Sequence, residues 1–193
     1  LLERAERKLK NQYISRGKYG VQITTTVTPL ERNRVALNFD ISEGEVAKIR
    51  QINFVGNKVF KDKDLAGEFV LSTPGFLSWY SKNDQYSKPK LQGDLENLRS
   101  FYLNQGYLEF TIDSTQVSIT PDKRDIFITV NLTEGKNYRV SEIKLAGDLI
   151  VPEAELRKLI KLAPGEVFSR ERLTESTKLI QDRLGNEGYA FAN

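Results

Sequence analysis

Closely spaced acidic residues are the first candidates in this sequence for acid–base chemistry. Three pairs stand two or three residues apart: Asp62/Asp64, Asp122/Asp125 and Glu153/Glu155. A pair of carboxyl groups can supply a general acid and a base or nucleophile. Histidine and cysteine are both absent from the 193 residues, which removes the commonest general base and the thiolate. A serine–lysine pair or a lysine nucleophile stays possible in principle.

The positions of these acids favour a structural role over catalysis. All three pairs fall where the pattern predicts a helix start or a turn, and acids stabilise both. The glycines fall at turns and helix ends, so no phosphate-binding loop is indicated. We therefore predict that the chain is not an enzyme and that it needs no metal or other cofactor.

Charge and hydropathy argue against a nucleic-acid partner and against a membrane-spanning helix in this sequence. The 29 Lys and Arg residues nearly balance the 26 Asp and Glu residues, and the signs alternate along stretches such as 3–8, which is typical of a solvated helix face. Because no basic run is interleaved with aromatic residues, we expect no nucleic-acid partner. No apolar run approaches the roughly 18 residues that a membrane-spanning helix needs.

An internal repeat of about 90 residues organises the chain. Several markers recur in the same order: Tyr13-x3-Gly17 with Tyr102-x3-Gly106 and Leu184-x3-Gly188, Thr28-Pro29 with Thr120-Pro121, Glu43-Gly44 with Glu134-Gly135, and Pro74-Gly75 with Pro164-Gly165. Such an ordered series predicts an array of similar units rather than one domain.

Hydrophobic periodicity gives the elements of the middle unit. Residues 49–54 alternate and end at a Gly-Asn turn, which predicts a strand. Two helices follow: Leu65 and Phe69 share one face, and Leu91, Leu95, Leu98 and Tyr102 form a longer stripe. Residues 108–119 and 126–132 then alternate on either side of a polar turn, which predicts a hairpin. The order is strand, helix, helix, strand, strand.

This order, the Gly-Tyr step after the second helix and the strand-ending Glu-Gly resemble the POTRA family of outer-membrane barrel proteins. Residues 91–123 are similar to the third POTRA domain of the barrel-assembly proteins. The resemblance implies an α+β fold, in which each module has a three-stranded mixed sheet with two helices on one face. We assign residues 1–46 to a partial module, 47–136 to a complete one, and 137–193 to a partial one.

The two partial modules supply different pieces. Residues 1–46 supply a second helix and the closing hairpin, whereas 137–193 supply a first strand, two helices and the start of a second strand at 189–193. We expect the natural protein to continue on both sides, and each partial module to leave an apolar face exposed unless another copy covers it. The links at 43–49 and 134–140 span only a few residues, so we expect an elongated arm.

The family resemblance implies a function without catalysis. It indicates a periplasmic segment of an outer-membrane protein from a Gram-negative bacterium, anchored by a C-terminal barrel outside this sequence. The segment would act as a scaffold and chaperone-like arm that binds accessory lipoproteins and unfolded outer-membrane proteins by adding strands to a sheet edge. POTRA modules also occur in two-partner secretion transporters, organellar import barrels and division proteins, and the fold alone does not separate these roles.

A change of phase predicts an irregularity in the second strand of the middle unit. The apolar side chains are even-numbered at Leu108, Phe110 and Ile112 and odd-numbered at Val117 and Ile119. A strand can change phase only through an extra residue, so we predict a β-bulge within 113–115. The matching strand at 21–27 keeps one phase, so the bulge should be special to the middle unit.

By family resemblance, this strand is a sheet edge that receives a propeller-type accessory lipoprotein at 110–119. The predicted partner-binding residues are Phe110, Ile112, Asp113, Ser114, Thr115, Gln116, Val117 and Ile119. An alternative remains open, in which Val117 and Ile119 simply fill the core. A second possible contact is the loop after Pro74-Gly75, which is about eight residues longer than its counterpart and carries Phe76, Trp79 and Tyr80. These aromatic side chains could instead cover the helices of their own unit.

Overall fold

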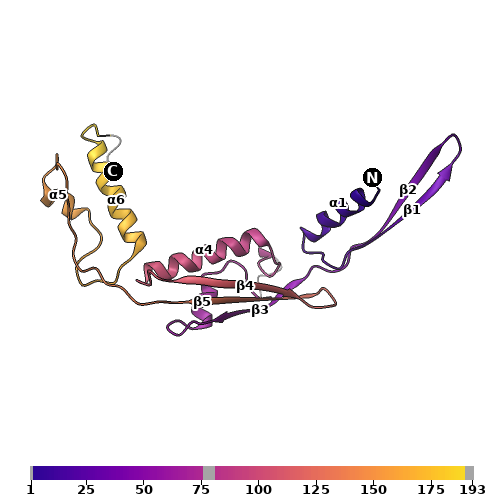
Figure 1. Ribbon diagram of the computed structural model, residues 1–193, viewed down its shortest axis with the longest axis horizontal. Helices are drawn as coiled ribbons and strands as arrows, with labels where there is room; N and C mark the ends of the chain where they lie inside the picture. The colour runs from indigo at the N-terminus through magenta and orange to yellow at the C-terminus, as the bar shows by residue number, and fades with distance from the viewer. Residues whose placement is uncertain (1, 76–80, 190–193) are drawn as a thin grey trace.

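The computed structural model describes residues 2–75 and 81–189 and has the form of an elongated arm (Figure 1). The first unit contains α1 (Leu2–Ile14), β1 (Gln22–Leu30) and β2 (Arg34–Ser42). The middle unit contains β3 (Lys48–Val55), α2 (Asp62–Gly67), α4 (Lys88–Asn104), β4 (Thr111–Ile119) and β5 (Asp125–Thr133). The last unit contains α5 (Glu153–Lys158) and α6 (Arg170–Gly185).

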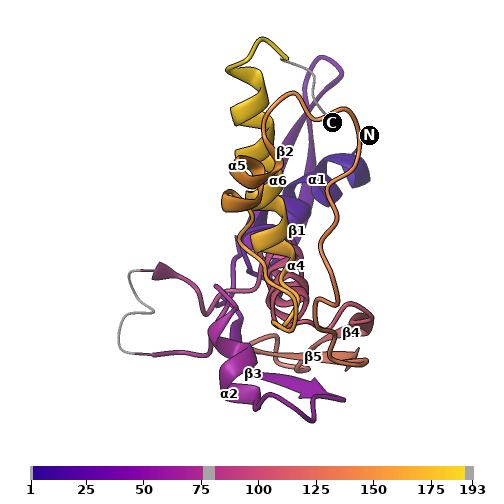
Figure 2. The same cartoon turned by 90° about the vertical axis from the view of Figure 1, so that its left-hand side faces the viewer.

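The two ends of the arm rise on the same side of the middle sheet. In Figure 1, α4 lies along one side of the sheet, and α6 and the β1–β2 hairpin rise from either end of it. Figure 2 shows the same arrangement from the end, with the sheet at the bottom and both outer units above it. The predicted extended form is therefore confirmed, with the addition that the arm is bent.

The middle sheet has the predicted mixed topology. Its strand order is β3-β5-β4, in which β3 runs parallel and β4 antiparallel to the central strand β5. Leu65 of α2 and Leu91, Leu98 and Tyr102 of α4 join the sheet residues in one buried core. The apolar stripe of α4 accounts for this packing, because residues three, four and seven positions apart share a helix face. The α+β prediction is confirmed.

A buried acid ties α4 to the segment that follows α2. Asp94 lies in the second turn of α4 and is almost fully buried. Its carboxylate accepts hydrogen bonds from the backbone N–H groups of Val70, at 2.7 Å, and Leu71, at 2.9 Å. Both oxygens of the buried carboxylate are thus satisfied, which is the condition for a polar group to sit in a core.

The first unit is a hairpin that is only partly covered. The nine paired positions of β1 and β2 show no register shift, from Gln22↔Ser42 to Leu30↔Arg34, as predicted for this unit. Helix α1 reaches the start of the hairpin, where Thr25 Oγ1 donates to Glu6 at 3.4 Å. Several apolar side chains on one face of the hairpin are exposed beyond this point: Val27, Val35 and Leu37. The apolar face expected of a partial unit is present.

The last unit differs from the prediction in two respects. Residues 140–145 form no strand, although their alternation favours one. In the middle unit the ladder partner of the matching strand β3 is β5, and a strand without a ladder partner does not form. The spacing of Leu173, Ile180 and Leu184 repeats that of the α4 stripe and favours a buried Leu173, but Leu173 is 46% exposed and Ser176 is buried instead. The predicted strand start at 189–193 lies largely outside the described residues.

One backbone hydrogen bond recurs at both junctions between units. The N–H of Ala47 donates to the carbonyl of Gly17 at 2.9 Å, and the N–H of Tyr138 donates to the carbonyl of Gly106 at 2.8 Å. Both glycines follow a long helix and have positive φ, at 82° and 89°, a conformation that costs glycine little. The repeated marker in the sequence thus corresponds to a repeated attachment of each linker to the preceding unit.

Candidate partner-binding edge

Strand β4 lies at an edge of the middle sheet. It pairs with β5 on one side, and no strand in the described part of the chain pairs with its other side. An edge of this kind presents a row of backbone N–H and C=O groups that an extended segment can bind. Strand β3 forms the opposite edge.

The predicted bulge is present in β4. Ile112 pairs with Leu132 and Ser114 pairs with Asn131, so that Asp113 is the extra residue in the ladder. Ile112 before the bulge and Val117 after it consequently face the same side of the sheet as Leu132 and Ile128. The change of hydrophobic phase therefore arises from a bulge within the predicted stretch 113–115.

The predicted binding residues fall into three groups by exposure. Phe110 is 4% exposed and stacks on Tyr102 with ring centroids 4.1 Å apart, so it belongs to the core, and its assignment as a contact residue is corrected. Ile112, Thr115 and Ile119 are half-buried at the margin of the core. Asp113, Ser114, Gln116 and Val117 are exposed.

Val117 and Ile119 differ in their environment. Val117 is 40% exposed, although its partner Ile128 on the central strand is fully buried. The side chain of Ile119 packs in part against the core. An apolar side chain that sits on the core side of an edge strand and stays open to solvent can be covered by an added strand. The geometry thus favours contact for Val117, while Ile119 serves partly as core.

The opposite edge carries a second bulge, which the sequence analysis missed. In β3, Ile49 pairs with Ile126 and Gln51 pairs with Phe127, so that Arg50 is extra. The signal was available, because the apolar phase changes from odd at Ile49 to even at Ile52. A shallow groove of about 290 Å³ runs beside this edge, between β3 and α2.

A buried carboxylate at the end of β5 was also missed as an organising residue. Glu134 accepts hydrogen bonds from the hydroxyl of Tyr102, at 2.8 Å, and from the N–H groups of Lys58, at 2.9 Å, and Val59, at 3.2 Å. Burial raises the pKa of Tyr102 well above its usual value, and the hydrogen bond to Glu134 raises this pKa further. The Glu-Gly marker therefore marks a buried junction of helix, loop and sheet.

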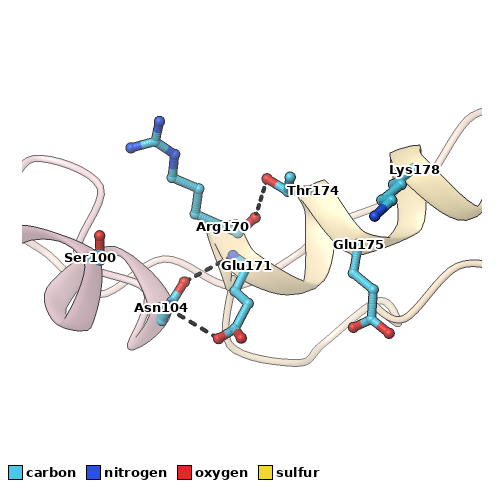
Figure 3. Close-up of a pocket in the computed structure, with 7 residues that line it drawn as sticks. All are labelled: Ser100, Asn104, Arg170, Glu171, Thr174, Glu175 and Lys178. Atoms are coloured by element: carbon cyan, nitrogen blue, oxygen red, sulfur yellow. Dashed lines mark hydrogen bonds between the residues drawn. The ribbon is translucent and has the colours of Figure 1, made fainter. Parts of the chain in front are cut away.

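The groove between the middle and last units has no catalytic arrangement. It lies between α4 and α6, has a volume of about 590 Å³ and is lined by Ser100, Asn104, Arg170, Glu171, Thr174, Glu175 and Lys178 (Figure 3). The Glu171 N–H donates to Asn104 Oδ1 at 2.9 Å, which joins the two units. Arg170 points away from this pair (Figure 3), so the charged groups do not converge on one point.

Within residues 2–75 and 81–189, no group of three or more acidic side chains is placed to hold a metal ion, and no helix is long and apolar enough to cross a membrane. Phe76, Trp79 and Tyr80 lie outside the described residues, so their role as a loop contact stays a prediction.

Comparison with known proteins identifies the family. The model of the POTRA family, described as a surface antigen variable number repeat, matches residues 1–44, 47–135 and 138–193. These three segments account for nearly the whole chain. The chain belongs to the POTRA family. Membership also agrees with the prediction of a non-catalytic chain, since the relatives described below bear the name of an assembly factor.

Individual relatives narrow the comparison. The chain is 38% identical over 192 residues to the outer membrane protein assembly factor BamA of Neisseria meningitidis. The matched region covers 99% of this chain and 24% of that protein. It is 28% identical over 183 residues to BamA of Buchnera aphidicola, covering 94% and 29%. The chain thus spans about a quarter of the length of these relatives.

A solved structure shares the fold of these POTRA units. The crystal structure of Haemophilus influenzae BamA POTRA3-5 matches 97% of this chain and 70% of that chain, with a TM-score of 0.51 and 18% sequence identity. At this level of identity the likeness concerns the fold alone.

Proposed function

We propose that the chain is the periplasmic POTRA arm of an outer-membrane β-barrel assembly factor, and that it binds accessory lipoproteins and nascent barrel strands by β-augmentation. The observation that carries this proposal is the edge strand β4, which combines an outer side that no described strand pairs with, a bulge at Asp113 and the exposed apolar Val117. The 38% identity to a BamA protein over nearly the whole chain supports barrel assembly over a secretion or import role.

The chemistry of an unfolded barrel strand suits such an edge. A nascent strand is extended, alternates apolar and polar side chains and lacks backbone hydrogen-bond partners. Pairing with β4 would satisfy its backbone irrespective of sequence, and Val117 would add a small apolar contact. We assign the propeller-type lipoprotein to residues 112–119 of the same edge, without the buried Phe110, and place the barrel that anchors the full-length protein beyond this segment.

Site-specific crosslinking tests the proposal. Because the chain has no cysteine, one introduced cysteine labels one position. Gln116→Cys carries a photoreactive group on the exposed face of β4, and Lys144→Cys carries the same group on a distant exposed position. With the purified propeller-type lipoprotein of the same organism, Gln116→Cys should crosslink and Lys144→Cys should not. Equal crosslinking from both, or from neither, would contradict the proposal.

A further inference from the structure

Three side chains hold the β4 bulge together across the two strands. Thr111 and Thr133 are direct cross-strand partners, and both hydroxyls donate to the carboxylate of Asp113. Thr111 Oγ1 lies 2.9 Å from Oδ1, and Thr133 Oγ1 lies 2.7 Å from Oδ2. The extra residue is thus fastened to its own strand through Thr111 and to the central strand through Thr133.

A fourth polar contact fixes the residue that follows the bulge. Asn131 Nδ2 donates to Ser114 Oγ at 2.9 Å. Thr133 and Asn131 alternate along β5 with the buried Leu132, so they lie on the face opposite the core. We call these contacts among Thr111, Asp113, Ser114, Asn131 and Thr133 the clamp. The clamp lies on the surface, separate from the hydrophobic packing that holds the unit together.

The clamp decides which side chains β4 presents. With Asp113 as an extra residue, Thr115, Val117 and Ile119 pair with Val130, Ile128 and Ile126 and share their face. A ladder without the bulge would shift by one residue and place Ser114, Gln116 and Ser118 on that face instead. Asp113 is exposed and contributes no apolar packing, so its own contribution to the bulged register is made through these hydrogen bonds, beside the packing of Ile119 against the core.

We propose that Thr133, a residue of the central strand, is a positioning residue that fixes the register of the binding edge through Asp113. This inference rests on the proposed function of β4 as a binding edge. It extends that function from the edge strand to a residue of β5, which β4 separates from any strand added at the edge.

The chain offers closely matched variants. Thr133→Val removes the hydroxyl and keeps the shape of the side chain, and Thr133→Ser restores the hydroxyl. Thr129 lies on the same face of β5, two pairs from the bulge, and its hydroxyl makes no hydrogen bond within the described residues. Thr129→Val is therefore the same chemical change on the same strand without loss of the clamp.

Hydrogen exchange of the whole chain, followed residue by residue by NMR, gives the first readout. In Thr133→Val the amides within 113–119 that donate to β5 should exchange roughly tenfold faster, as expected for loss of a hydrogen bond to a carboxylate, while the core amides of β5 keep their wild-type rates. Thr133→Ser and Thr129→Val should match the wild type. If Thr133→Val exchanges like Thr129→Val, the clamp does not hold the bulge and the inference is wrong.

Binding of a fluorescent eight-residue peptide of alternating valine and threonine gives the second readout. Thr133→Val should bind it roughly fivefold or more weakly, and Thr133→Ser should recover wild-type binding. Faster exchange at 113–119 with unchanged peptide affinity would overturn the positioning role. A wild-type chain that binds the peptide without protecting β4 would instead refute the proposed function of the edge, whatever the exchange rates of the variants.

Discussion

The hydroxyl of Tyr102 donates a 2.8 Å hydrogen bond to the carboxylate of Glu134 inside the middle POTRA unit. This contact joins the last turn of α4 to the end of β5, and the same carboxylate accepts the N–H groups of the loop after β3. Three elements of the unit thus meet at one buried acid, immediately before the link to the next unit.

Replacement of Tyr102 by Phe should lower the free energy of unfolding by about 1–3 kcal/mol, because a buried carboxylate loses one of its donors. Urea unfolding of the whole chain measures this change. Tyr107→Phe is the control, since its ring packs against Tyr102 but its hydroxyl makes no hydrogen bond among the described residues. Equal losses from both variants would show that the contact with Glu134 contributes nothing specific.

The raised pKa of Tyr102 predicts a dependence of stability on alkaline pH. Burial first, and then the hydrogen bond to Glu134, favour the protonated hydroxyl in the folded chain. The unfolded chain releases this proton near pH 10, so the contribution of Tyr102 is fully present below about pH 10 and falls as the pH rises above it. Unfolding measured from pH 8 to pH 11 should show a steeper loss for the wild type than for Tyr102→Phe. Parallel curves would contradict the assignment.

Gly106 should tolerate alanine less well than Gly165 does. Both glycines have positive φ, so alanine costs roughly 1–2 kcal/mol at either position. A Cβ at Gly106 would also lie 2.7 Å from Val167 Cγ1 and 2.8 Å from the carbonyl oxygen of Tyr138, whereas a Cβ at Gly165 meets nothing within 4 Å.

The readout is the amide of Tyr138, which donates to Gly106. Gly106→Ala should accelerate its hydrogen exchange, and Gly165→Ala should leave it near the wild-type rate. Similar rates in the two variants would mean that the close approach at Gly106 does not hold this junction.

Val117 and Ile128 face each other across the ladder and should separate binding from stability. Ile128 is fully buried, so Ile128→Ala should cost about 2–5 kcal/mol of unfolding free energy. Val117 is exposed, so Val117→Ala should cost no more than about 0.5 kcal/mol and should weaken lipoprotein binding. Ile119→Ala should cost less than Ile128→Ala because Ile119 is only half-buried. A loss of stability in Val117→Ala comparable to that in Ile128→Ala would show that Val117 packs in the core and is not a contact residue.

Patterns that depend on local periodicity were predicted well from the sequence. The bulge at Asp113 followed from a single change of phase, since side chains on a strand alternate strictly. The repeat markers located both junctions, because the left-handed glycine after each long helix is a local requirement of the backbone.

Features that depend on distant partners were not predictable in this way. The alternation at 140–145 is correct for a strand, but a strand also needs a neighbour with which to pair. Phe110 and Val117 are both apolar residues close to the bulge, and only the packing of Tyr102 against Phe110 shows which of them is buried. The role of Glu134 depends on donors that lie 32, 75 and 76 residues away in sequence.

Residue-resolved hydrogen exchange of the chain, free and bound to the propeller-type lipoprotein, tests whether β4 is the binding edge. Bound lipoprotein should protect backbone amides within 114–119 on β4 and leave those of α4 and of residues 140–150 unchanged. The same amides should be protected, more weakly, by an unfolded outer-membrane barrel protein. Tight binding with protection confined to other elements, and none on β4, would contradict the account.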